Sequence, residues 1–227
     1  MQVSNDSVLE VISDSICPWC YVGKRRLEGA LKLLGSAAPR VVWKPFQLNP
    51  GMPVEGMDRR EYRSRKFGSW ERSQQLDAQV HGAGEEVGIK FAHEKMLRTP
   101  NTLASHKLIL FANQAGRPTD PVVERIFRAY FVEGRDIGNP EVLAEIGAVG
   151  GLPKEDVIRA LLDDELGRAV ELEEKRSRSL VLNGVPTFVL GGISVASGAQ
   201  PEELLANLTQ HTQAPEGASC NLDGECQ

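Results

Sequence analysis

Two cysteines separated by two residues are the strongest candidates for chemistry in this chain. Cys17 and Cys20 flank Pro18 and Trp19, directly after a short apolar run that predicts a buried strand. From Pro18 to Leu34 the apolar residues have helical spacing, which places Cys17 at a helix N-terminus. There, unpaired backbone N–H groups and the positive end of the helix dipole favour the thiolate over the thiol.

This spacing predicts different roles for the two sulfurs. Cys20 lies one helical turn deeper on the same face, close enough to bond Cys17 but less able to reach a partner. We therefore expect Cys17 to be the reactive thiol and Cys20 the resolving thiol. Pro18 suits the first helical position, where its missing N–H is no loss, and Trp19 adds an apolar platform for a substrate.

A structural zinc site is the main alternative for such a pair. A zinc knuckle normally holds two cysteines in a turn beside polar or glycine residues, and it needs a second pair of ligands. Here the pair caps a helix after an apolar strand, which favours redox chemistry. The four histidines, His81, His93, His106 and His211, are scattered without a metal-binding spacing. We expect no metal or other cofactor.

Composition narrows the classes of partner and the compartment. A net charge of −5 from 26 basic and 31 acidic residues argues against nucleic acid or an anionic membrane as the main partner. No apolar run approaches the roughly 20 residues of a spanning helix, and the first residues lack the pattern of a signal peptide. We therefore expect a soluble, cytoplasmic protein. Reducing compartments keep thiols reduced, so the four cysteines favour chemical use over a structural framework.

Four segments together carry a resemblance to a known family. They are the strand followed by Cys-Pro-Trp-Cys-Tyr, residues 42–50, residues 101–108 with His106, and residues 184–189 followed by 197–201. They resemble the DsbA-like thioredoxin-fold oxidoreductases, specifically the FrnE subfamily, over about residues 8–213. The resemblance implies a protein thiol:disulfide oxidoreductase or isomerase. Its partners would be disulfide- or thiol-containing proteins and cellular thiol reductants.

The order of the remaining elements predicts an α/β thioredoxin-like fold with a large all-helical insertion. A strand at 40–46 completes the first half, and the breaker cluster Asn49–Pro53 marks a boundary. Helices without a convincing strand follow, at 102–115, 121–133, 140–149, 154–163 and 165–182. A hairpin at 185–196, turning at Gly191-Gly192, and a helix at 201–208 end the fold. We expect a thioredoxin-like domain at 1–47 and 166–213, the insertion at 48–165, and a mobile tail at 214–227.

Two helical faces can also be assigned from their patterns. The arginine-rich segment from Met57 to His81 favours a solvated helix face, with a mobile lid as the alternative. In the helix at 165–182, we expect Leu166, Ala169, Val170 and Leu172 to face inward. Its basic run at 175–178 complements the helix dipole, and Asn183-Gly184 should end it.

Pro186 is the second candidate site. A proline is tolerated sterically at the start of a strand, and only roughly one X-Pro bond in twenty is cis in folded proteins. The family resemblance implies a cis Val185–Pro186 bond that faces Cys17 and leaves the backbone of Val185 free to pair with an extended substrate peptide. His106 matches a family motif, but we interpret it as a hydrogen-bonded residue between helices.

The C-terminal tail contains a second cysteine pair, Cys220 and Cys226, with five residues between them. Asp223-Gly224 is a turn signal that would let the two sulfurs meet. Because so short a loop stabilises little, the pair favours electron exchange with Cys17 and Cys20. The alternative is an incidental disulfide between these two tail cysteines.

Two other functions also remain open. The first is a glutathione-dependent isomerase or transferase of the same fold, resembling the hydroxychromene-carboxylate isomerases, which typically have serine in place of Cys17. The second is a zinc-binding or redox-sensing protein that uses all four cysteines. If the chain is an oxidoreductase, the Pro-Trp pair lacks the histidine of strongly oxidising relatives and implies a less oxidising enzyme.

Overall fold

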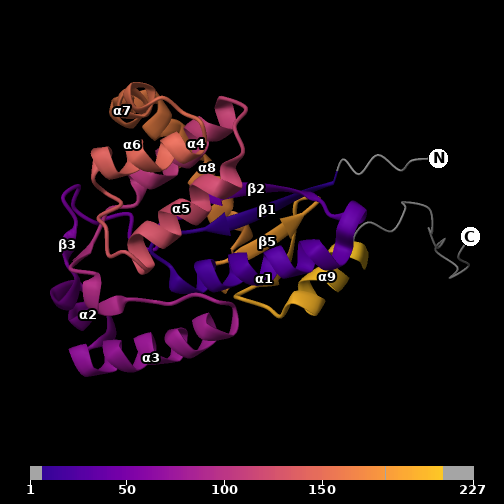
Figure 1. Cartoon of the computed structure of the whole chain (residues 1–227), viewed down its shortest axis with the longest axis horizontal. Helices are drawn as coiled ribbons and strands as arrows, with labels where there is room; N and C mark the ends of the chain where they lie inside the picture. Colours follow the sequence, from indigo (N-terminus) through magenta and orange to yellow (C-terminus); the bar gives the residue numbers. More distant parts are fainter. Residues whose placement is uncertain (1–6, 182, 212–227) are drawn as a thin grey trace, which may run out of the picture.

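A four-stranded mixed sheet lies at the centre of the protein (Figure 1). The computed structural model describes residues 7–181 and 183–211, so Cys220 and Cys226 lie outside the described residues. The strands run in the order β2 (Arg40–Pro45), β1 (Val8–Ser13), β5 (Thr187–Leu190) and β6 (Ile193–Ser197). β1 is parallel to β2 and antiparallel to β5, which is antiparallel to β6. This is the predicted thioredoxin-like sheet.

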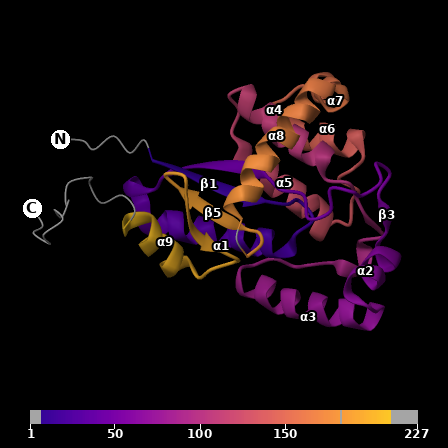
Figure 2. The ribbon, with the colours of Figure 1, turned by 180° about the vertical axis from the view of Figure 1, so that it is seen from behind.

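Helix α1 (Pro18–Leu34) connects the two parallel strands with the bounds that its sequence predicts. Pro18 occupies the first turn, and Gly35 ends the helix with a φ of 56°, which glycine adopts without a steric penalty. Helix α9 (Glu202–His211) lies beside α1 in both views (Figures 1 and 2). Short 3₁₀ turns occur at Gly35–Ala37 and His93–Lys95.

The segment between β2 and β5 is mostly helical. It spans the insertion predicted at 48–165 and, in its last helix, the start of the second part predicted for the thioredoxin-like domain. Its helices are α2 (Arg59–Phe67), α3 (Trp70–Glu86), α4 (Leu103–Gln114), α5 (Thr119–Phe131), α6 (Pro140–Val149), α7 (Lys154–Leu162) and α8 (Asp164–Leu180). In Figure 1, α4, α6, α7 and α8 are drawn above the sheet, α5 to its left, and the α2–α3 pair below it. Helix α5 buries the apolar side chains that its sequence assigns to the core, including Phe127 and Phe131.

Two expectations about the segment between β2 and β5 are wrong. Strands β3 (Met57–Asp58) and β4 (Arg98–Thr99) pair antiparallel where no strand was expected, because two-residue strands are too short to leave a periodic pattern. Leu172 does not face inward, since its side chain is 71% exposed. The buried stripe of α8 runs through Leu166, Val170 and Glu174, and a residue two positions from Val170 points to the opposite side.

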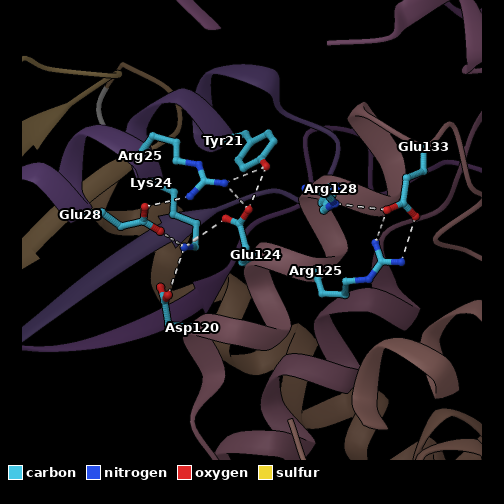
Figure 3. A network of polar contacts seen from close by, with 9 residues as sticks. All are labelled: Tyr21, Lys24, Arg25, Glu28, Asp120, Glu124, Arg125, Arg128 and Glu133. Carbon is cyan, nitrogen blue, oxygen red and sulfur yellow. Dashed lines mark hydrogen bonds and ion pairs between the residues drawn. The ribbon is translucent and has the colours of Figure 1, made fainter. Parts of the chain in front are cut away.

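A charged network fastens α1 to α5 (Figure 3). Lys24 of α1 is only 1% exposed, and its Nζ lies 3.1 Å from Asp120 Oδ2 and 3.3 Å from Glu124 Oε2. The same ammonium group donates to Glu28, one turn along α1. Tyr21 donates its hydroxyl proton to Glu124 at 2.9 Å. The insertion is therefore held to the helix that begins at Cys17.

The ionisation of this network follows from its burial and its charges. Burial acts to lower the pKa of Lys24, but the carboxylates of Asp120, Glu28 and Glu124 outweigh it and raise that pKa. Burial acts to raise the pKa of Glu28, but Lys24 and Arg25 hold it below its usual value of 4.5. Both groups are consequently charged at neutral pH.

We expect Lys24→Met to lower the free energy of unfolding by about 2 kcal/mol at pH 7, because it leaves three carboxylates without their shared cation. The pKa of Glu28 is lower in the folded state than in the unfolded state. The stabilisation that Glu28 contributes is therefore fully present above its unfolded-state pKa, and it is lost as the pH falls through its folded-state pKa. Denaturant unfolding at pH 7 and below pH about 4 measures both effects. Lys32→Met, an exposed change on the same helix, is the control, and equal losses in both variants would contradict the assignment.

Candidate active site

Cys17 is the residue at which α1 begins. It has an extended backbone, with φ −89° and ψ 112°, and its N–H donates to Asp14 O at 3.0 Å. The N–H of Cys20 donates to Cys17 O at 3.0 Å, which closes the first turn of the helix. The side chain of Cys17 makes no capping hydrogen bond to the helix, so stabilisation of its thiolate stays a prediction.

The two sulfurs differ in their surroundings. Cys17 is 6% exposed and Cys20 is 0% exposed, and both are free thiols in the structure. Burial raises the pKa of the Cys20 thiol well above its usual value, and its contact with Cys17 adds to this. Cys20 is therefore a poor attacking group in the reduced protein. This difference agrees with the roles that the sequence predicts.

The loop before β5 faces the first cysteine. Cys17 Sγ donates to Val185 O at 3.7 Å, across 168 positions of sequence. The Val185–Pro186 bond is cis, as the resemblance implied. Contrary to expectation, the carbonyl of Val185 is not free while Cys17 is reduced, because it accepts a hydrogen bond from the Cys17 thiol. The structure thus brings Cys17, Val185 and Pro186 together.

Gly23 allows α1 to approach this loop, and sequence reasoning gave it no role. A Cβ at this position would lie 2.8 Å from Pro186 Cγ, closer than van der Waals contact permits. One turn later, Arg26 donates to Ala199 O at 2.6 Å. A glycine inside a helical pattern was the available signal, because such a residue often marks a close contact.

A buried carboxylate fixes the turn that leads to the site, and it was also missed. Asp14 is fully buried, and its Oδ2 accepts from the N–H of Leu48 at 2.7 Å. Its Oδ1 accepts from Ile16 N at 3.4 Å and lies 3.6 Å from His106 Nε2. Asp14 therefore joins the end of β1 to the chain that leaves β2. Lying between two serines, it reads in the sequence as an ordinary loop residue.

His106 has a different contact from the expected one. Its Nε2 lies 3.2 Å from Phe46 O, so with the proton on Nε2 it donates to the segment after β2 and does not link two helices. Trp19, in contrast, is exposed beside Cys17, where an apolar platform was expected.

Among residues 7–181 and 183–211, no helix combines the length and apolar character that crossing a membrane requires.

Comparisons with known proteins agree with this geometry. A probable DsbA oxidoreductase from Streptomyces coelicolor is similar in structure, with 29% identity, a TM-score of 0.82, and coverage of 97% of this chain and 98% of its own. The cytosolic disulfide reductase DsbM from Pseudomonas aeruginosa has the same fold, with 22% identity, a TM-score of 0.61 and coverage of 91% and 100%. The uncharacterized protein YwbO of Bacillus subtilis (strain 168) is 25% identical over 193 residues, which are 84% of this chain and 90% of YwbO.

A family model describes almost the whole of the folded part. The model for the DSBA-like thioredoxin domain matches residues 8–210, from the first residue of β1 to the last turn of α9. This match includes both cysteines at the start of α1 and the loop that faces them. The chain therefore belongs to the DSBA-like thioredoxin domain family.

Proposed function

We propose that this protein is a thiol:disulfide oxidoreductase that acts on proteins through Cys17 and Cys20. The observation that carries the proposal is the arrangement of the two thiols, with Cys17 at the start of α1 and Cys20 fully buried one turn below it. This difference supports Cys17 as the thiol that captures a substrate and Cys20 as the thiol that acts after capture. Trp19 offers the substrate an exposed apolar contact beside the reactive sulfur.

The reaction is two successive thiol–disulfide exchanges. The Cys17 thiolate attacks one sulfur of a substrate disulfide, forms a mixed disulfide, and releases the other substrate sulfur as a thiolate. Cys20 then loses its proton and attacks Cys17 Sγ, which releases the second substrate sulfur and leaves a Cys17–Cys20 disulfide. The substrate gains two electrons, and a cellular thiol reductant restores the enzyme.

The burial of Cys20 affects the order of these steps. Its raised pKa keeps it protonated near neutral pH, so capture at Cys17 precedes resolution. Run in reverse, the oxidised pair forms disulfides in reduced substrates, and repeated capture without resolution isomerises them. A DsbM neighbour described as a disulfide reductase supports the reducing direction and a cytoplasmic location.

The finer assignments rest on the sequence. The Cys-Pro-Trp-Cys-Tyr motif supports a FrnE-type protein. The tail cysteines, which lie outside that resemblance, support a second redox pair at Cys220 and Cys226. In this proposal, the thioredoxin-like part at 1–47 and 166–213 carries the thiols, and residues 48–165 form a separate helical domain. The presence of Cys20 argues against a glutathione-dependent isomerase, which has no need of a resolving thiol.

Alkylation tests the different reactivity of the two thiols. In reduced Cys220→Ser/Cys226→Ser protein, we expect iodoacetamide to modify Cys17 at least about tenfold faster than Cys20, because Cys20 is fully buried and its raised pKa leaves little thiolate. Mass mapping of digests taken at intervals measures both rates, and unfolding the protein should make them similar. Faster modification of Cys20 in the folded protein would contradict the roles.

Turnover assays test the activity. We expect Cys17→Ala to reduce insulin disulfides and to refold scrambled ribonuclease no faster than buffer containing the same reductant. Cys20→Ala should lose most insulin reduction but keep part of the isomerase activity, since Cys17 alone can capture and release. Full insulin reduction by Cys17→Ala would rule out the proposal. An activity that requires glutathione and is insensitive to Cys20→Ala would favour the isomerase instead.

The tail pair is tested in the full-length chain. If Cys220 and Cys226 pass electrons to the first pair, Cys220→Ser/Cys226→Ser should slow steady-state insulin reduction several-fold. A single turnover by pre-reduced protein should be unchanged, because it uses only Cys17 and Cys20. Unchanged steady-state rates would exclude the relay, and one equivalent of zinc lost with the tail cysteines would support the metal-binding alternative.

A further inference from the structure

A cavity of about 80 Å³ lies next to the start of α1. Ile16 and Pro18, the two chain neighbours of Cys17, form part of its wall, and α2 forms the opposite part. Its volume exceeds the roughly 10–15 Å³ that a single water molecule needs. The residues on either side of Cys17 thus border a space large enough for a small chemical group.

Helix α2 lines the cavity with three cations. Arg59, Arg63 and Lys66 follow helical spacing and share one face, which the sequence analysis expected to be solvated. That expectation is wrong for Arg59, which is only 4% exposed, and for the largely buried Arg63. The wall contains one carboxylate, Asp77 of α3, which lies 2.7 Å from both arginines. The wall thus holds three cations and one anion in a protein whose net charge is −5.

His93 also lines the wall and does not balance this charge. Burial, aided by Arg59 and Arg63, lowers the pKa of His93 to about 4, so the ring is neutral near pH 7. Its Nε2 is buried, lies 4.0 Å from Asp77 Oδ1, and has no hydrogen-bond partner within the described part of the chain. The cavity wall consequently carries an excess of positive charge and a polar atom that is not satisfied.

The cations are held in position without being neutralised. Arg63 donates to Ser73 Oγ and lies over the ring of Phe67, with its guanidinium carbon 4.9 Å from the ring centroid. Lys66 donates to Tyr62 Oη at 3.0 Å, and none of the described carboxylates pairs with it. A purely structural role, tying α2 to α3 through Asp77, would explain Arg59 and Arg63 but not Lys66. Lys66, which is exposed and has no carboxylate partner among the described residues, is therefore available to bind an anion beside Arg63.

We propose that this cavity binds a carboxylate that the substrate carries close to its reactive disulfide. The carboxylate would pair with Lys66 and Arg63, while the methylene groups beside it pack against Ile16 and Pro18. Two sources offer this chemistry, an acidic residue beside a cysteine in a polypeptide and a small acidic thiol. The inference rests on the proposed function, because it requires the substrate sulfur to meet Cys17.

The test measures capture alone, in full-length protein carrying Cys20→Ala, Cys220→Ser and Cys226→Ser so that only Cys17 reacts. The probes are short peptide disulfides identical except for Glu or Gln beside the cysteine. Oxidised glutathione, which carries carboxylates, is compared with hydroxyethyl disulfide, which carries none. Lys66→Gln removes the unpaired cation. Arg65→Gln is the matched control, because Arg65 lies on the same helix, pairs with Glu61 and does not line the cavity.

We expect the Glu peptide to react about tenfold faster than the Gln peptide, the ratio given by one charge-assisted hydrogen bond. Lys66→Gln should bring this ratio close to one, whereas Arg65→Gln should keep the ratio. The peptide's glutamate also changes the reactivity of the cysteine beside it. This effect is the same with every protein variant, so comparing the variants removes it. A preference confined to oxidised glutathione and lost in Lys66→Gln would identify a small acidic thiol as the source.

Two results would overturn the inference. Equal rates for all probes would show that the cavity selects no carboxylate. If Arg65→Gln lowered the preference as much as Lys66→Gln does, the preference would come from long-range attraction between charges and not from the cavity. Both results leave the proposed function intact, since the neutral disulfide still reacts with Cys17. Failure of the proposed function itself looks different, because then no disulfide reacts with Cys17 at all.

Discussion

Close packing of α1 against the loop that ends in Pro186 is the contact on which the site depends. The approach requires Gly23, since a larger residue would collide with the proline ring. It sets Cys17 Sγ 3.7 Å from Val185 O, although the two residues come from opposite ends of the fold. Arg26 holds the same helix to Ala199, just beyond β6. The reactive sulfur is therefore positioned by the meeting of two distant segments as well as by its own turn.

The helical insertion acts on the same helix from its other side. Lys24 is buried among carboxylates of α1 and α5, which orients α1 relative to the insertion. Helix α2 then brings its cations to the cavity beside Pro18. In the proposed function, the segment between β2 and β5 therefore supports the helix that carries the thiols and also forms the surface that a captured substrate would meet.

Local signals predicted much of this structure. Helix α1 is flanked by a proline and a glycine that define its ends, so its bounds were predicted to the residue. The site residues Asp14 and Gly23 were missed because their roles come from partners far away in sequence, Leu48 and Pro186. The buried face of α2 was missed for the same reason, since an arginine reads as solvated until Asp77 is placed beside it.

The central claim is that Cys17 captures the substrate and Cys20 releases it. Trapping tests this most directly, with Cys20→Ala and Cys17→Ala proteins exposed to the same mixture of disulfide-containing proteins and quenched with acid. If these roles are right, Cys20→Ala should form covalent adducts that map to Cys17 and that a reductant removes, and Cys17→Ala should form none. Adducts in Cys17→Ala that map to Cys20, or no adducts in either protein, would contradict it.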